Sequence, residues 1–359
     1  MTQISIVIPN HGRRQVLRAT CLFYAKYYPQ STIHVVDSSG LSAADLELPD
    51  DVSKTIEVTQ TPLTNPHSKL SVVLEKLNER LVLLASNDDL YCFSSADIVR
   101  LLKSKADCAF PRWLMIREIP AQQNILRLWE GWTHFARAAS MDCSTRLTTF
   151  ADQGLNAFYG LYKVSAFKEV VKWQRDLFRF LNESQWSIAE NLVNLATLAL
   201  SWEDTTDSWC FRKLDRKYSQ NRNWRSPWIV FDELSKAPQF LNVKASLVKW
   251  IDQKVPAKFG VIDPERLLSS SVRGYQSARS RLWHSGHDFI LLPHPVDTGL
   301  VGGQIFDDQR FGYLVGTNFC KVAQIAGDNS WVSFPNAVGS FQRIPSGYFF
   351  IEKTFEVMK

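Results

Sequence analysis

The chain has 359 residues, 45% of them hydrophobic, and a formal net charge of +5. This size allows one large domain or two ordinary ones, and the lack of low-complexity tracts or like-charge blocks excludes a largely disordered chain. The weak positive charge gives no reason to expect a nucleic-acid partner. Apolar runs are too short for a membrane span, and the N-terminus lacks the pattern of a signal peptide. Six scattered cysteines argue against a zinc knuckle or disulfide scaffold and predict a reducing, cytoplasmic location.

The first forty residues predict a β-α-β unit. A β-branched run at 4–8 predicts a strand that ends at Pro9, helical spacing follows over 13–28, and a second apolar run covers 33–37. Two strands joined through a helix are expected to be parallel. No G-x-G-x-x-G sequence follows the first strand, which disfavours a dinucleotide-binding fold. Asp37, at the end of the second strand, is placed to hydrogen-bond a nucleoside.

The stretch 81–89 is the strongest functional signal. Four apolar residues at 81–84 predict a strand buried on both sides, and the polar residues Asn87, Asp88 and Asp89 follow it. Ligands of open α/β sheets bind beyond the carboxyl ends of strands, and Mg²⁺ or Mn²⁺ prefers carboxylate oxygens. The stretch therefore indicates a metal–diphosphate site. The alternative is an acidic turn before a helix that Ser94 or Ser95 would cap.

The remaining chain alternates predicted helices and strands, then changes in texture. Helices are expected at 68–80, 95–105, 165–180 and 185–200, and strands near 54–58, 108–110, 158–162 and 209–211. We expect a helix and loops at 120–157, covering a pocket. Residues 226–285 are expected to be helical, and short strands are expected at 289–292, 313–315, 331–334 and 348–351. We place a boundary at 238, which gives a catalytic domain at 1–238 and an accessory region at 239–359.

Several of these motifs, taken in order, resemble GT-A glycosyltransferases of the family-2 type, especially their short, divergent bacterial branch. The motifs are Ser5–Asn10, Val35–Ser39 and Leu83–Asp89, followed by Phe158–Tyr162 and a helix that carries Glu190. The resemblance covers the first 215 residues or so. It implies an α/β fold: a GT-A-type, Rossmann-like, mostly parallel sheet flanked by helices, with a C-terminal helical and mixed α/β accessory region.

The resemblance also implies a nucleotide-sugar site. Pro9, Asn10 and Asp37 would hold the nucleoside, and Lys69 falls where related chains often have a basic residue near the nucleotide. Asp89, the last residue of the acidic cluster, would bind the Mn²⁺ or Mg²⁺ ion that bridges the diphosphate.

The first two positions of the cluster and a later basic run complete the predicted binding residues. Asn87 stands where aspartate is usual, so it can hydrogen-bond a ribose but is a weaker metal ligand; Asp88 lies between the two. Arg212 begins a basic run, 212–225, that could contact the diphosphate. The same run could equally be a solvated face or a patch for acidic membrane lipids.

Two carboxylates compete for the role of catalytic base. Inverting members of the family have a carboxylate near the acceptor hydroxyl, which attacks the anomeric carbon as the nucleoside diphosphate leaves. Glu190 is the first choice, and Asp204, in a Glu-Asp pair that resembles a family motif, is the second. The bland alternative for Glu190 is an exposed helix residue.

The sequence thus predicts a cytoplasmic, metal-assisted glycosyltransferase, acting with inversion. It would move a sugar from a nucleotide-diphospho-sugar donor to a glycan or lipid-linked glycan hydroxyl in polysaccharide biosynthesis. Association with the inner face of the membrane is left open, and so is the oligomeric state. The alternatives are a non-catalytic nucleotide- or glycan-binding relative, which Asn87 favours, and a nucleotidyltransferase, for which 11–14 is a poor version of the required basic loop.

Overall fold

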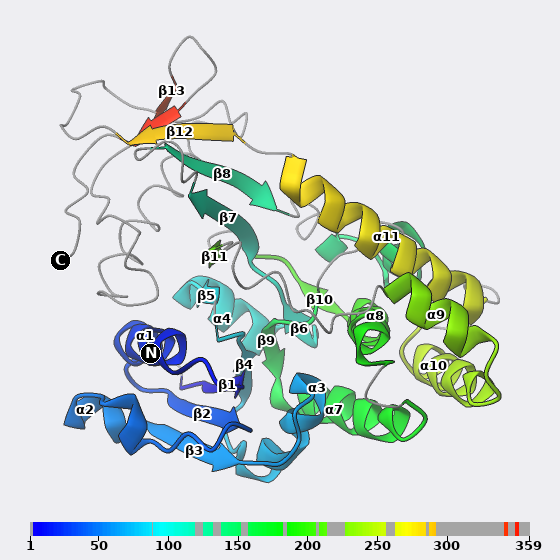
Figure 1. Ribbon diagram of the computed structural model, residues 1–359, viewed down its shortest axis with the longest axis horizontal. Coiled ribbons are helices and arrows are strands. Elements are labelled where there is room, and N and C mark those ends of the chain that lie inside the picture. Colours follow the sequence, from blue (N-terminus) through cyan, green and yellow to red (C-terminus); the bar gives the residue numbers. More distant parts are fainter. Residues whose placement is uncertain are drawn as a thin grey trace.

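The computed structural model describes residues 3–87, 89–118, 125–131, 138–151, 157–181, 185–205, 208–213, 227–255, 263–284, 287–291, 341–343 and 349–351. In this part of the chain, two seven-stranded sheets are combined with flanking helices (Figure 1). The predicted class, α/β with a mostly parallel sheet flanked by helices, is confirmed. The described cysteines are all free thiols. None of the described helices combines the length and apolar character needed to cross a bilayer.

The first sheet is mostly parallel, and its strand directions define one carboxyl edge. In spatial order it contains β10 (Trp202–Glu203), β6 (Cys108–Ala109), β9 (Gly160–Lys163), β4 (Leu81–Leu84), β1 (Ser5–Asn10), β2 (Thr32–Asp37) and β3 (Ile56–Gln60). Only β9 runs antiparallel to its neighbours, β4 and β6. The other strands of this sheet therefore end at the same edge.

A proline near the end of the central strand β1 costs the sheet no hydrogen bond. The carbonyl of Val7 accepts from Ala85 N on the β4 side (3.0 Å), and the carbonyl of Asn10 accepts from Ser38 N on the β2 side (3.3 Å). Because successive residues of a parallel strand bond alternately to the two neighbours, Pro9 faces the β4 side. The pairing of β1 with β4 ends at Val7, so no partner awaits the N–H that proline lacks.

The described helices cover both faces of the sheet or gather beside it. They are α1 (Arg14–Tyr27), α2 (Asp50–Ser53), α3 (Pro66–Lys69), α4 (Ser95–Lys103), α6 (Cys143–Phe150), α7 (Val164–Phe178), α8 (Trp186–Leu198), α9 (Pro227–Ser235), α10 (Phe240–Lys254) and α11 (Pro264–His284), with 3₁₀ turns at Ala44–Leu46 and Leu70–Lys76. The helix expected at 68–80 begins earlier, because Asn65 caps it by accepting from His67 N at 2.8 Å. From Leu70 it tightens into a 3₁₀ helix.

Helix α8 forms the centre of the helical layer seen at the right of Figure 1. It contacts α6, α7, α9, α10 and α11. Trp250 of α10 packs against Trp173 of α7 at 5.4 Å between ring centroids and donates Nε1–H to the carbonyl of Ala196 at 3.0 Å. The hydrophobic core therefore continues across residue 238. The division into two domains at that point stays a prediction.

The second sheet corrects one expectation. In spatial order it contains β13 (Phe341–Arg343), β14 (Phe349–Ile351), β12 (His287–Leu291), β8 (Ile125–Gly131), β7 (Arg112–Glu118), β11 (Trp209–Lys213) and β5 (Asp89–Cys92). The expectation of helix and loops at 120–157 was wrong at 125–131, where pairing with β7 overrides a weak local pattern. It was right for α6. The strands expected at 289–292 and 348–351 are present, and those at 313–315 and 331–334 lie outside the described residues.

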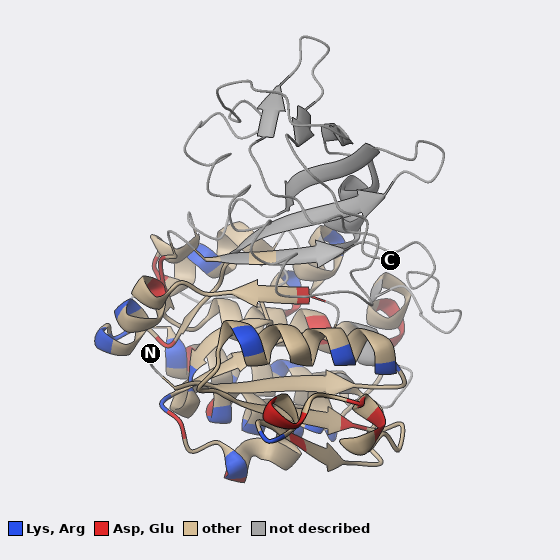
Figure 2. Cartoon of the chain, turned by 90° about the vertical axis from the view of Figure 1, so that its left-hand side faces the viewer, with Lys and Arg blue, Asp and Glu red and all other residues tan. Residues whose placement is uncertain are grey.

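Charges of both signs are interspersed over the described helices and loops (Figure 2). Single-sign fields are what steer nucleic acids and anionic surfaces. Over the residues that the structure describes, charge distribution alone therefore points to no particular macromolecular partner.

Candidate active site

Three strand ends meet at the carboxyl edge of the first sheet. Asn10 and Asp37 are register partners at the ends of β1 and β2, and Asn87 follows β4. The Asn10 side chain donates Nδ2–H to Asp37 Oδ1 at 2.7 Å. It also accepts, at Oδ1, a hydrogen bond from Asn87 Nδ2 at 2.8 Å. The structure thus joins three sequence-predicted binding residues in one side-chain network, with buried Pro9 directly before it.

The carboxylate of Asp37 is fully buried and organises the loop that follows β2. Its Oδ2 accepts from Ser39 N at 2.7 Å and from Leu41 N at 2.9 Å, and the Ser39 hydroxyl donates to both oxygens. Burial alone would raise the pKa of Asp37, but the hydrogen bonds from Leu41, Asn10 and Ser39 outweigh it and hold the pKa below its ordinary value. The group is therefore an anion at neutral pH.

A buried cation lies against the same strand end. Lys69, the last residue of α3, is 1% exposed, and its Nζ donates to the backbone carbonyl of Asn10. Burial lowers the pKa of Lys69, and attraction to Asp37 opposes that shift. An ammonium group carries three N–H donors, so a single carbonyl does not exhaust its capacity.

Asn87 is fixed through both its side chain and its backbone. Its Oδ1 accepts a long hydrogen bond, 3.5 Å, from Arg13 Nη1, and its carbonyl accepts from Thr20 Oγ1 at 2.7 Å. Arg13 is half-buried at the N-cap of α1, directly after Gly12, whose φ of +67° makes the tight turn out of β1. Helix α1 therefore brings a guanidinium to the strand ends.

Asp89 begins β5 and is fully buried. Its Oδ2 accepts from Ser86 Oγ at 2.6 Å and lies 3.4 Å from the Tyr91 hydroxyl, while its backbone carbonyl accepts from Tyr24 at 3.1 Å. Asp88 lies outside the described residues.

The donor chemistry of this corner fits a divalent cation in part. Among the residues that the structure describes, no three His, Cys, Asp or Glu side chains cluster as metal ligands. Mg²⁺ is commonly held by only one or two carboxylates and completes its shell with phosphate oxygens and water. Asp89 supplies one carboxylate, so a cation here would depend on the diphosphate for further ligands.

The remaining predicted residues lie on elements other than those that carry the side-chain network. Arg212 of β11 is the register partner of Asp89, which places its backbone beside the acidic cluster. Asp204 follows β10 and is exposed, at the same sheet edge as Asn10; three strand spacings separate β10 from β4, or about 14 Å. Glu190 is half-buried on α8. The roles of these residues stay predictions.

Sequence reasoning missed Arg13 and Ser39 as members of the site. Ser39 lies within a quoted strand-end motif, and its position two residues after Asp37 is the usual signal of an Asx turn. Arg13 lies in the 11–14 loop, which was weighed only as a glycine-rich phosphate loop. Its place at the expected start of the helix was the available clue.

No protein-family model matches the chain, and no curated protein matches it. Among solved structures, TarS of S. aureus is similar with a TM-score of 0.41 and 12% identity, over 78% of this chain and 55% of that one. TarS residues 1–349 give 0.40 and 11%, over 80% and 93% of the two chains. The galactosyltransferase LgtC, in complex with donor and acceptor sugar analogues, gives 0.27 and 13%, over 49% and 64%.

A galactosyltransferase is thus among the solved structures to which the chain is similar. The chain spans about half the length of the first TarS structure. TM-scores below 0.5 and identities of 11–13% transfer no substrate, metal or mechanism from these proteins to this chain.

Proposed function

We propose that this chain is a glycosyltransferase that moves a sugar from a nucleotide-diphospho-sugar donor to a glycan or lipid-linked glycan hydroxyl. The observation that carries the proposal is the meeting of three strand ends in one polar network, beside a buried lysine. The carboxyl edge of a parallel sheet is where α/β folds bind nucleotides. The loop held by the Asp37 carboxylate and the side-chain amides of Asn10 and Asn87 offer hydrogen-bonding groups to a nucleoside. The ammonium group of Lys69 offers positive charge to a diphosphate.

The residues divide by chemistry along the edge. Pro9, Asn10 and Asp37 form the nucleoside end, and Lys69 brings positive charge toward the phosphates. Asp89, with Asp88 and Arg212 beside it, forms the diphosphate end. A divalent cation held there by Asp89 would supply charge stabilisation for the leaving nucleoside diphosphate.

The acceptor hydroxyl needs a base, and two residues compete for that role. Asp204 is exposed and follows β10 at the sheet edge that carries the network, and this exposure supports Asp204 as the base. Glu190 is half-buried on α8. Either carboxylate would take the acceptor proton as the hydroxyl attacks the anomeric carbon, and direct displacement by the acceptor gives inversion.

A nucleotide panel tests the binding part of the proposal. UDP, GDP, CDP and dTDP are titrated into the full chain with Mn²⁺ and with EDTA, using calorimetry. We expect one nucleotide to bind in the micromolar range and Asp89→Ala to weaken its binding with Mn²⁺ at least tenfold. The control Asp252→Asn removes an exposed carboxylate on α10 and should bind as wild type does. Binding of no nucleotide, or binding unaffected by Asp89→Ala, would refute the proposal.

The second candidate is a non-catalytic nucleotide- or glycan-binding relative. Asn87 favours it, because a carboxamide is a weaker metal ligand than a carboxylate. Hydrolysis of UDP-glucose or GDP-mannose with Mn²⁺ separates the two. Turnover that Glu190→Gln or Asp204→Asn abolishes supports the enzyme, whereas nucleotide binding without turnover supports the relative.

Location and partners beyond the donor belong to the same proposal. A cytoplasmic enzyme that modifies a lipid-linked glycan would work at the inner face of the membrane. Sedimentation with anionic vesicles tests that association. A nucleotidyltransferase is the third candidate, and it would instead release pyrophosphate from a nucleoside triphosphate.

A further inference from the structure

One carboxylate determines which way two carboxamides face at the strand ends. An ionised Asp37 can only accept hydrogen bonds, so Asn10 must turn its Nδ2 group toward it, as the 2.7 Å contact shows. The Oδ1 atom of Asn10 then faces Asn87 and can only accept. Asn87 must therefore donate, which turns its own Oδ1 toward Arg13.

We propose that Asp37 is a positioning residue that acts through Asn10 to hold Asn87 with its amide oxygen on the Arg13 side. We call this chain of hydrogen bonds, from Asp37 through Asn10 to Asn87, the relay. It tolerates a carboxylate at position 37 but not a second one at position 87. The geometry explains why asparagine stands at the first position of the acidic cluster. A neutral oxygen is thereby presented beside the guanidinium of Arg13. The relay itself rests only on the hydrogen bonds; its effect on ligand binding rests on the proposed nucleotide site.

The relay predicts that the aspartate expected from the family resemblance is unfavourable at 87. In Asn87→Asp a carboxylate oxygen replaces Nδ2 at 2.8 Å from Asn10 Oδ1, so two acceptors meet without a proton. Asn10 cannot turn over, because Asp37 would then face its oxygen. Arg13 would attract the new carboxylate, but at its other oxygen, and so does not relieve the contact with Asn10.

A second substitution should repair the first. In Asp37→Asn with Asn87→Asp, Asn10 can turn over, accept from the new amide at 37 and donate to the new carboxylate at 87. The amide oxygen at 37 would still accept from Ser39 N and Leu41 N. The net charge equals that of the wild-type chain, so the repair measures hydrogen-bond direction and not charge.

The experiment is a double-mutant cycle on the full chain, read out without and with nucleotide. Unfolding in urea is measured for wild type, Asn87→Asp, Asp37→Asn and the double variant, without ligand or metal. Titration of the nucleotide that binds wild type follows, in EDTA. We expect each single variant to lower the unfolding midpoint and to weaken nucleotide binding about tenfold, a change of about 1.4 kcal/mol. The double variant should return to within about threefold of wild-type affinity.

A matched cycle supplies the control. Asn78 and Asp252 are exposed and far apart in the chain, so Asn78→Asp and Asp252→Asn make the same chemical exchange outside the relay and should be additive. Additivity at positions 37 and 87 as well would overturn the relay. So would a double variant that does not fold, whereas a single variant that fails to fold while the double folds supports it. If wild type binds no nucleotide, the proposed function fails, and the unfolding cycle still decides the relay.

Discussion

Two buried cations, Lys69 at the strand ends and Arg146 on α6, show how differently this fold uses an enclosed positive charge. Arg146 of α6 is 2% exposed, and its guanidinium lies 4.7 Å from the centroid of the Trp202 ring. It donates to the backbone carbonyls of Ala138 (2.8 Å), Met141 (2.6 Å), Leu198 (3.2 Å) and Leu200. Lys69, by contrast, donates to the single carbonyl of Asn10 near the Asp37 carboxylate.

The difference lies in how much hydrogen-bonding capacity each cation has left. The last carbonyls of a helix lack partners within the helix, and Arg146 donates to that of Leu198, the last residue of α8, and to that of Leu200, two residues beyond it. Four of its five donors are thereby engaged, so its role is structural. Lys69 makes one hydrogen bond to the described residues, so its ammonium group has donors left over, which the proposed function assigns to a phosphate. Burial of a cation therefore does not by itself support a site; donor capacity left over at a strand end does.

The largest expected effect comes from removing Arg146, the cation whose hydrogen-bond donors are nearly all engaged. Arg146→Leu removes a hydrogen bond from four backbone carbonyls, of which those of Ala138 and Leu200 keep a second donor in Met141 N and Cys143 Sγ. Each acceptor that is left unsatisfied costs about 1–3 kcal/mol before any relaxation. We expect the free energy of unfolding to fall by about 3–5 kcal/mol in urea denaturation. Arg179, 71% exposed in its side chain, is the matched control, and Arg179→Ala should change it by less than about 0.5 kcal/mol. A loss below about 1 kcal/mol for Arg146→Leu would remove the contrast.

Lys69, the cation that has hydrogen-bond donors left over, should behave in the opposite way. Lys69→Met removes one hydrogen bond but also the cost of burying an ammonium group, so stability should change by less than about 1 kcal/mol. Nucleotide affinity should fall about 10- to 100-fold, the equivalent of one charged hydrogen bond of about 1.5–3 kcal/mol. Calorimetric titration measures this, with exposed Lys54→Met as control. Unchanged affinity together with a large loss of stability would place Lys69 in the same structural class as Arg146.

His67, a neighbour of Lys69 on α3, should make the free energy of unfolding depend on pH. His67 is 3% exposed, its ring lies 4.7 Å from that of Phe158, and neither ring nitrogen has a hydrogen-bond partner among the described residues. Burial lowers the pKa of His67 to about 4 from the usual 6.5. The unfolded chain therefore binds the extra proton first, and the stability from this group is complete above pH 6.5 and is lost as the pH falls toward 4.

At pH 5 this loss is about 2 kcal/mol, at 1.36 kcal/mol for each pH unit below 6.5. His67→Phe removes the titrating group and should reduce by that amount the difference in unfolding free energy between pH 8 and pH 5. The same exchange at an exposed position, His11→Phe, is the matched control. An unchanged pH dependence in His67→Phe would mean that the ring is hydrated in solution.

The contrast between the two cations also marks the limit of sequence reasoning. Strands β1, β2 and β4 were predictable because each is a short apolar run that ends in a turn residue, and parallel directions bring their ends together. Nothing in the sequence indicated the role of Arg146, because its partners are backbone carbonyls up to 54 residues away. Every residue has such a carbonyl, so no residue type marks the partner. Strand β8 was missed for a different reason: its own apolar pattern is weak, and it is the antiparallel pairing with the preceding strand β7 that makes it a strand. That Asp37 lies at a strand end was readable; that its carboxylate turns back to Ser39 and Leu41 was not.

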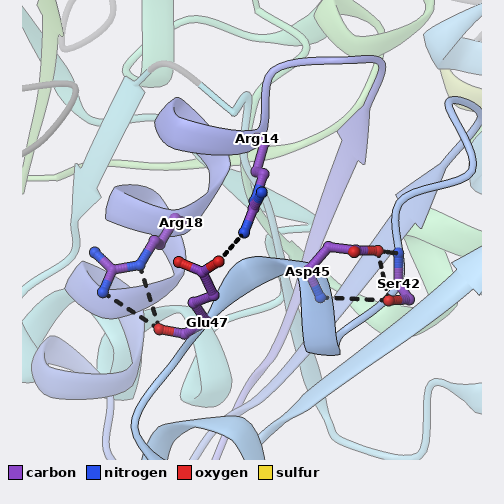
Figure 3. Close-up of polar contacts among 5 residues, drawn as sticks. All are labelled: Arg14, Arg18, Ser42, Asp45 and Glu47. Carbon is purple, nitrogen blue, oxygen red and sulfur yellow. Dashed lines mark hydrogen bonds and ion pairs between the residues drawn. The ribbon is translucent and has the colours of Figure 1, made fainter.

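The smallest expected effect, that of replacing Arg18, is the reference for the effect of Arg146→Leu. Arg18 makes the same kind of contact as Arg146, guanidinium to backbone carbonyl, at 3.3–3.4 Å from the oxygen of Glu47, but at the surface (Figure 3). The Arg14 side chain pairs with the Glu47 carboxylate beside it at 2.5 Å, with exposed fractions of 46% and 74%.

Water replaces such exposed contacts at little cost, so Arg18→Ala should lower the free energy of unfolding by less than about 1 kcal/mol. Urea denaturation in parallel with Arg146→Leu measures both on one scale. A ratio of about three or more between the two losses assigns the difference to burial of the carbonyls, since the donor chemistry is the same. Equal losses of unfolding free energy would mean that solvent reaches Arg146. The distinction between Arg146, as a structural cation, and Lys69, as a cation with donors left for a ligand, would then have no energetic basis.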